Sequence, residues 1–253
     1  MAETFVLVHG SWHGGWAWDG VRARLEEDGH RTLAPTLAGH GSGAHRADVR
    51  HADCVDSVVT AIESEGLTDV VLVGHSFGGT IISKVVERVP DRVKRLVYLT
   101  AFVLEDGQSV ADNLPVEQVE EFSRLAAESR DNTVACPWEV FRDFFMQDAR
   151  EETARDIWGQ LCPQPYQTWT DRLDLSRFYE LETPRSYIAC RDDLALPPGE
   201  WHPGMSSRLG VFELLEIPGS HEVMFTRPRE VAESIVLASG GHTLEESRHG
   251  NRV

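Results

Sequence analysis

The chain has 253 residues, of which 24 are lysine or arginine and 41 are aspartate or glutamate, so its formal net charge is −17. This acidity argues against binding to nucleic acid or to an anionic membrane through non-specific charge. No run reaches the roughly 18 apolar residues that a membrane-spanning helix needs. The length suits one α/β domain that carries an inserted subdomain.

Cysteine and histidine usage bears on the compartment and on metals. The four cysteines, Cys54, Cys136, Cys162 and Cys190, are scattered without a Cys-x-x-Cys pair, which is typical of reduced structural thiols. The N-terminal residues have no basic, signal-like region, so we expect a cytoplasmic protein. The histidine spacing fits no zinc pattern, and we expect no metal site. Composition does not separate a monomer from a homodimer.

Apolar runs alternate with helical patterns along the chain. In chain order we predict a strand at 4–8, a helix at 16–28, a strand at 30–37, a loop at 37–47, a helix at 52–65, a strand at 70–73, a helix at 78–88, strands at 95–102, 185–189 and 212–217, and a helix at 230–238. The strands are continuous apolar runs, which is typical of a parallel sheet covered on both faces. Functional groups should then gather at the carboxyl ends of the strands.

Residues 104–183 differ from the rest of the chain. They hold helical segments at 116–130 and 138–146, broken by prolines, and no clear parallel strand. We interpret them as a helical cap or lid, inserted between a first core part at 1–103 and a second core part at 184–239. The tail at 240–253 lacks apolar periodicity, and we expect it to be disordered.

A short glycine-flanked motif, Gly74-His75-Ser76-Phe77-Gly78, lies between a buried strand and a helix. It matches G-x-S-x-G, in which a sharp strand-to-helix turn exposes the serine above the sheet. The flanking glycines let the two backbones approach without Cβ clashes, and the helix N-terminus suits a developing negative charge. The motif therefore predicts Ser76 as a nucleophile.

A nucleophilic serine needs a base, and the base needs an orienting acid. In this motif's context they follow the serine in the order acid, then histidine. His221 lies in a turn after the strand at 212–217, and two aspartates follow the strand at 185–189. Joint placement after the last two strands favours His221 as the base and Asp193 as the acid. Their rivals are His202 and Asp192.

The loop after the first strand should supply half of an oxyanion hole. That loop is rich in glycine and leads into the helix that begins near Trp16. We predict that the backbone N–H groups of Ser11 and Phe77 are the two donors. Capping of the helix is a second role for the same loop, and the two roles are compatible.

Two stretches together resemble a known family. FVLVHG-x-x-HGGW-x-W at 5–18 and GHSFGG at 74–79 are similar to the α/β-hydrolase branch that contains plant methylesterases, hydroxynitrile lyases and bacterial ester hydrolases. The resemblance covers most of the core, and it implies the α/β-hydrolase fold with about six mostly parallel strands, helices on both faces and a helical cap. PRSYIACRDDLALP at 184–197 resembles the family's acid segment, which puts the acid at Asp193.

Two positions separate the branches of this family. The lyase branch has threonine where this chain has Gly10, and it has lysine directly after the catalytic histidine, where this chain has Glu222. Both differences argue against cyanohydrin cleavage, because that lysine holds the cyanide charge. The esterase branch has an apolar residue directly after the catalytic histidine, so Glu222 at this position leaves the identity of the substrate open.

The residues and the resemblance together predict a cofactor-independent serine hydrolase that cleaves a small carboxylic ester with water. The resemblance implies a methyl ester or lactone of an apolar or aromatic molecule. Aromatic residues of the cap are candidates for the pocket wall, although such residues also form ordinary cores. The pocket residues we expect are Trp12, His75, Trp138, Phe145, Trp158 and Glu222.

Other functions fit the same three residues. A lyase, a decarboxylating methylesterase or a cyclase would use the same triad, and a small-molecule-binding protein with slow turnover would also retain it. Product analysis separates a lyase, a decarboxylating methylesterase or a cyclase from a hydrolase. Ligand binding that survives Ser76→Ala, with negligible turnover, identifies a small-molecule-binding protein.

Overall fold

The computed structural model describes residues 2–240, so the predicted tail lies outside the described residues except for Gly240. Its main sheet has six parallel strands in the order β2-β1-β3-β4-β7-β8. The strands are β1 (Thr4–Val8), β2 (Arg31–Leu33), β3 (Val70–His75), β4 (Val93–Leu99), β7 (Arg185–Cys190) and β8 (Glu213–Ile217). The predicted sheet of about six mostly parallel strands is confirmed.

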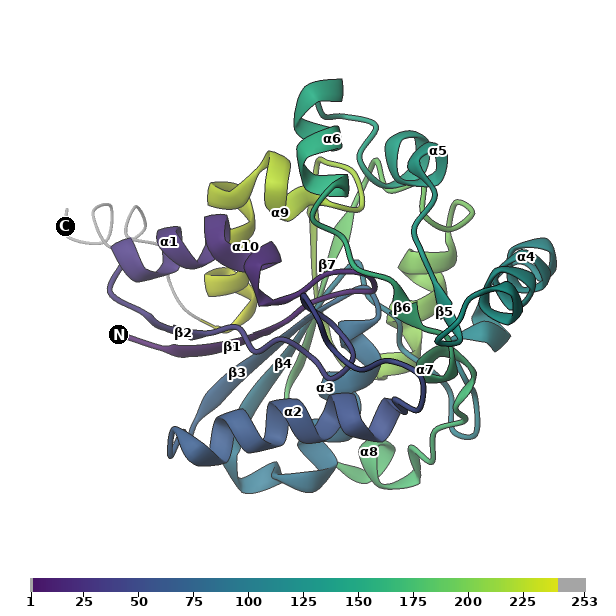
Figure 1. The fold of residues 1–253 in the computed structure, drawn as a ribbon. Helices are drawn as coiled ribbons and strands as arrows, with labels where there is room; N and C mark the ends of the chain where they lie inside the picture. Colours follow the sequence, from purple (N-terminus) through teal and green to yellow (C-terminus); the bar gives the residue numbers. More distant parts are fainter. Residues whose placement is uncertain (1, 241–253) are drawn as a thin grey trace, which may run out of the picture.

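Helices cover both faces of this sheet, and the strand side chains alternate between two cores. Val6, Leu72 and Leu96 pack with one set of helices, whereas Phe5 and Val71 pack with the other. In Figure 1 the two sets lie on opposite sides of the strands. The first set includes α2 (His51–Ser64) and α3 (Gly78–Arg88), and the second includes α1 (Asp19–Glu27) and α10 (Pro228–Ala238).

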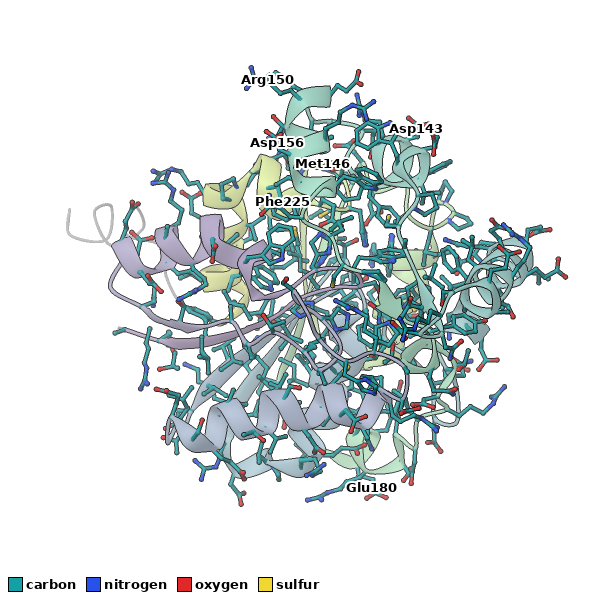
Figure 2. All side chains as sticks on the ribbon, in the orientation of Figure 1. Asp143, Met146, Arg150, Asp156, Glu180 and Phe225 are labelled. Carbon is teal, nitrogen blue, oxygen red and sulfur yellow. The ribbon has the colours of Figure 1, made fainter. Side chains whose placement is uncertain are left out.

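The segment between β4 and β7, here called the β4–β7 segment, contains most of the remaining elements. They are α4 (Val116–Glu128), β5 (Thr133–Val134), α5 (Trp138–Val140), a π-helical turn (Phe141–Phe145), α6 (Glu151–Trp158), β6 (Gln164–Pro165), α7 (Gln167–Thr170) and α8 (Ser176–Glu180). Figure 1 shows α4, α5 and α6 beyond the carboxyl ends of the strands, whereas α8 lies beside α3. Charged side chains such as Arg150, Asp156 and Glu180 point away from the molecule (Figure 2).

Short turns and one short helix complete the fold. They are 3₁₀ turns at Gly15–Trp18, Pro90–Arg92, Ala111–Asn113 and Ser206–Leu209, a π-helical turn at Glu200–Met205, and α9 (Val223–Thr226). Among the helices of residues 2–240, none is both long and apolar enough to cross a membrane.

Several predicted elements differ from the observed ones in length or type. The strand predicted at 30–37 ends at Leu33, because Pro35 has no N–H to continue the ladder. The strand predicted at 95–102 spans Val93–Leu99 and ends where Thr100 takes a φ of 38°. The segment at 104–183, for which no clear parallel strand is predicted, contributes none to the main sheet but contains a two-stranded antiparallel ladder between β5 and β6.

Candidate active site

Ser76 lies at a strained turn between the end of β3 and the start of α3. Its φ is 51°, in the left-handed region that non-glycine residues rarely adopt. A Cβ on Gly74 would lie 2.6 Å from the carbonyl oxygen of Gly78, and a Cβ on Gly78 would lie 2.5 Å from that of Val8. The turn is therefore as crowded as the motif predicts, and glycine is required on both sides of the serine.

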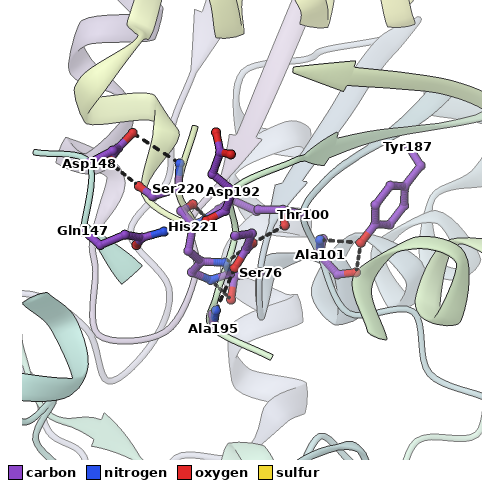
Figure 3. Close-up of polar contacts among 12 residues, drawn as sticks. Ser76, Thr100, Ala101, Gln147, Asp148, Tyr187, Asp192, Ala195, Ser220 and His221 are labelled. Carbon is purple, nitrogen blue, oxygen red and sulfur yellow. Dashed lines mark hydrogen bonds and ion pairs between the residues drawn. The ribbon is translucent and has the colours of Figure 1, made fainter. Parts of the chain in front are cut away.

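Three side chains form one hydrogen-bonded chain at the carboxyl ends of β3, β7 and β8. The hydroxyl of Ser76 lies 3.0 Å from Nε2 of His221, and Nδ1–H of His221 donates to Oδ2 of Asp193 at 2.7 Å. Figure 3 shows Ser76 and His221 facing each other. The structure thus brings together the serine, histidine and aspartate that the sequence singled out.

The charge of His221 depends on two carboxylates. Burial alone would lower its pKa, but the charge and hydrogen bond of Asp193 and the charge of Glu222 outweigh burial and raise the pKa above the ordinary 6.5. A raised pKa makes the imidazole a stronger base and stabilises the imidazolium that forms when it takes a proton.

Asp192, the rival of Asp193, and His202, the rival of His221, both bond other partners. Oδ2 of Asp193 also accepts from the Thr100 hydroxyl, and Oδ1 accepts from the N–H of Ala195 at 2.8 Å. Asp192 is exposed and accepts from the N–H of Gly219 at 2.9 Å. His202 bonds Ser206 at 2.6 Å. Of the two aspartates, Asp193 is the one that bonds His221.

The predicted oxyanion donors have free N–H groups. Within residues 2–240, neither the Ser11 amide nor the Phe77 amide donates a hydrogen bond to another protein group. The Phe77 amide lies at the N-terminus of α3, where the helix dipole favours negative charge. A Cβ on Gly10 would lie 2.9 Å from the His75 ring and 3.0 Å from Cβ of Ser76, so glycine lets this loop approach the serine.

A narrow, mostly apolar cavity of about 30 Å³ opens over Ser76 and His221. Of the predicted pocket residues, Trp12 and Phe145 line it, and Trp169 of the predicted cap does so as well. The remaining wall consists of Ser11, Phe102, Val110, Leu114, Gln118, Phe122, Ala195, Leu196 and Trp201. Gln118 is the polar side chain of this wall apart from the triad and Ser11.

Trp138 and Trp158, which the sequence predicts as pocket residues, do not line this cavity. The two rings pack edge to face at 5.8 Å, and the Arg155 guanidinium lies 4.1 Å from the centre of the Trp138 ring. Trp158 is 37% exposed and donates its indole N–H to the carbonyl of Cys136. These residues form a cluster of the β4–β7 segment outside the cavity wall.

His75 and Glu222 are also outside the cavity wall. His75 is buried and donates from Nε2 to the carbonyl oxygen of His221 at 3.0 Å, so it supports the turn that carries the base. Burial, reinforced by the neighbouring His221, lowers the pKa of His75 well below its usual value. Glu222 is buried, with Oε2 3.5 Å from Nε2 of His13.

Sequence reasoning missed several residues that contact this site. Trp201 stacks on the His221 ring with centroids 5.3 Å apart and planes 21° apart. Its position in the loop between the acid and β8 was the available signal. Thr100, which bonds Asp193, follows β4 and had no motif to mark it. Within residues 2–240, no group of three or more His, Cys, Asp or Glu side chains is arranged to hold a metal ion.

Comparison with known proteins adds the family. A model described as the alpha/beta hydrolase family matches residues 5–234. The chain belongs to the alpha/beta hydrolase family. A solved structure of an extracellular alpha/beta-hydrolase from a Paenibacillus species is similar to it, with 41% identity, a TM-score of 0.90, and coverage of 93% of this chain and 98% of that one.

Curated relatives of this alpha/beta hydrolase include named esterases. A carbendazim hydrolyzing esterase from a Nocardioides species is 34% identical over 92% of this chain and 98% of its own. Methylesterase 1 of Arabidopsis thaliana is 28% identical over 91% of this chain and 94% of its own. These relatives confirm the predicted family and support a carboxylic-ester hydrolase.

Proposed function

We propose that this alpha/beta hydrolase cleaves a small carboxylic ester through an acyl-enzyme on Ser76, without a cofactor. The observation that carries the proposal is the buried chain of hydrogen bonds from Ser76 through His221 to Asp193. Nε2 of His221 takes the hydroxyl proton while the Ser76 oxygen attacks the ester carbonyl carbon. Asp193 holds the tautomer in which Nδ1 carries hydrogen and Nε2 is free to accept.

The remaining steps use the same groups. The amides of Ser11 and Phe77 donate to the oxyanion of the tetrahedral intermediate, and one such donor commonly contributes about 3 kcal/mol. As the carbon–oxygen bond breaks, His221 gives its proton to the leaving alkoxide and the alcohol departs. His221 then takes a proton from water, the resulting hydroxide attacks the acyl carbon, and Ser76 is regenerated with release of the carboxylic acid.

The cavity wall supports an apolar or aromatic substrate. Trp12, Phe122, Phe145 and Trp169 pack against one another over the triad, and Trp201 closes another side. The present volume holds only one or two water molecules, so a substrate enters when wall side chains move. We expect residues 104–183 to form the cap whose side chains make this adjustment. Its substrate would be a methyl ester or lactone of an aromatic molecule.

The compartment remains a prediction. Cys54, Cys136, Cys162 and Cys190 are all free thiols, which favours a reducing compartment such as the cytoplasm. The Paenibacillus relative, by contrast, is described as extracellular. Fractionation of the native cells, with antibody detection of the chain, separates the two locations.

The proposed reaction is tested by following the oxygen of water. Purified protein is incubated with a panel of aromatic methyl esters in water labelled with heavy oxygen, and the products are analysed by mass spectrometry. Hydrolysis predicts methanol and a carboxylic acid that carries one labelled oxygen. A product without the label would instead identify a lyase. A product from which this protein has removed the carboxyl group would identify a decarboxylating enzyme. Ser76→Ala is the control and should give no product.

A further inference from the structure

The loop that supplies the predicted oxyanion donor Ser11 contains a second strained residue. Trp12 has a φ of 65°, although a bulky side chain strongly disfavours that conformation. Trp12 follows Ser11 directly, so its conformation fixes where the chain leaves Ser11, whose own N–H lies in the preceding peptide with Gly10. Such a conformation persists only where surrounding contacts fix it. The question is therefore which contacts hold Trp12.

Among residues 2–240, four hydrogen bonds hold Trp12, and all of them come from the β4–β7 segment. Its N–H donates to Oε1 of Gln164 at 3.0 Å, and its carbonyl accepts from the N–H of Cys162 at 2.8 Å and from the Cys162 thiol at 3.2 Å. Its indole N–H donates to the carbonyl of Val134 at 2.9 Å. Val134 contributes only its backbone carbonyl, whereas Cys162 contributes its N–H and its thiol, which is a weak donor. Gln164 is the member of the set whose side chain accepts the Trp12 N–H.

Gln164 is itself held in one orientation. It lies on β6 and is completely buried. Its Nε2 donates to the hydroxyl of Thr168 at 2.7 Å, and that hydroxyl donates to the carbonyl of Pro165 at 2.7 Å. Nε2 of His40 lies 2.8 Å from Oε1. Because the Trp12 N–H can only donate, the oxygen of the amide must face it.

We propose that Gln164 is a positioning residue that holds the oxyanion loop in the conformation needed for catalysis. The inference rests on the proposed function, because it assigns the Ser11 amide to the oxyanion. Gln164 does not line the cavity and contacts no reacting atom. It acts through Trp12, so part of the predicted cap would serve to assemble the catalytic centre as well as to cover it.

A second contact points the same way. The indole N–H of Trp169, on α7, donates to Oγ of Ser11 at 3.0 Å. The oxyanion loop is therefore bonded at two successive residues, Ser11 and Trp12, by side chains from β6 and α7. A loop bonded in this way is fixed relative to Ser76 before substrate binds, which is what electrostatic stabilisation of a transition state requires.

The test compares two substitutions at Gln164. Gln164→Met keeps the length of the side chain but removes the acceptor, and it should lower kcat at least tenfold while KM changes by less than about threefold. Gln164→Glu keeps an acceptor facing Trp12 and should recover most of kcat. Gln167→Met is the matched control, because that side chain bonds Thr170 and Asp171 instead of the oxyanion loop. Its kcat should equal that of the wild type.

A second readout separates positioning from simple loss of stability. Binding of a trifluoromethyl ketone, which forms a tetrahedral adduct with an oxyanion, should weaken in Gln164→Met by the same factor as kcat. Binding of the product acid should not change. If Gln164→Met does not fold, Gln164→Asn retains the buried amide but is one methylene too short, and it takes the place of Met in the same comparison.

The outcomes are distinct. Unchanged kcat in Gln164→Met, or an equal loss in Gln164→Met and Gln164→Glu, would overturn the positioning role. Failure of the proposed function would appear elsewhere: the wild-type protein would neither hydrolyse esters nor react with a fluorophosphonate at Ser76. A wild type that does both, with a Gln164→Met variant as active as the wild type, refutes only this inference.

Discussion

Replacing Asp193 with asparagine is expected to lower kcat/KM by about four orders of magnitude, as the same change does in a serine-protease triad. Three donors point at the native carboxylate. The Thr100 hydroxyl and Nδ1–H of His221 share Oδ2, and the N–H of Ala195 bonds Oδ1. An asparagine offers one acceptor oxygen, so its NH₂ group must face at least one of these donors.

Each orientation of the new amide has a cost. If NH₂ faces Ala195, two buried donors meet without an acceptor between them. If NH₂ faces His221, the imidazole takes the tautomer with hydrogen on Nε2 and cannot accept the proton of Ser76. The lost carboxylate also no longer stabilises the imidazolium. A ten-thousandfold loss corresponds to about 5.5 kcal/mol of transition-state stabilisation.

The assay compares steady-state hydrolysis of a 4-nitrophenyl ester by the wild type, by Asp193→Asn and by Asp192→Asn. Asp192→Asn is the matched control. Among the described residues this exposed side chain bonds only the Gly219 amide, so the change should alter kcat/KM by about threefold or less. An Asp193→Asn enzyme that keeps a tenth of the wild-type rate would refute the assignment of the acid. So would an equal loss in Asp192→Asn.

Three further outcomes are expected. First, kcat/KM should fall at acid pH with an apparent pKa above 6.5, because only neutral His221 accepts the proton of Ser76. Glu222→Gln should lower that pKa, since it removes a carboxylate that raises it. The pH–rate profiles of both proteins check this, and a profile that Glu222→Gln leaves unshifted would exclude the Glu222 contribution. Second, Gly78→Ala should yield little folded protein, because its Cβ would lie 2.5 Å from the Val8 carbonyl oxygen; a wild-type melting temperature in thermal unfolding would contradict this crowding. Third, Gln118→Leu should reduce the preference for esters with a second polar group over their apolar isosteres by about two- to tenfold, measured as a ratio of kcat/KM values, and a constant ratio would show that Gln118 does not contact substrate.

The parts of the fold that could be predicted are those whose limits are set by local residues. β1 begins and ends at the predicted residues, because an apolar run meets His9 and Gly10. α3 also has its predicted bounds, between Gly78 and the proline at position 90. The strand predicted at 30–37 is longer than the observed Arg31–Leu33, because the sequence shows an apolar run but not how far a partner strand pairs with it.

The triad can be predicted from the sequence more completely than the pocket can. Each member of the triad follows a strand of a parallel sheet, so chain order and strand ends are enough to bring Ser76, Asp193 and His221 together. Pocket residues depend on which face of a helix meets the core, and residue type alone does not give that face. Trp158 and Trp201 are both tryptophans near proline-rich turns, yet only Trp201 reaches the cavity.

Glu222 illustrates a second limit. Its position directly after His221 suggested that its charge faces the substrate. The turn at the start of α9 instead directs its carboxylate to His13, which comes from the loop after β1. A partner that lies more than two hundred positions away in the chain has no signature in a single sequence, so the interpretation of this residue had to come from the structure.

The central claim is that Ser76 is activated by His221 and Asp193, and one measurement tests it without knowledge of the substrate. The purified protein is incubated with an excess of a fluorophosphonate, and its intact mass is recorded beside that of Ser76→Ala. The account predicts a single adduct on the wild type and none on the variant. A folded wild-type protein that stays unmodified, or a Ser76→Ala variant that is modified to the same extent, would contradict it.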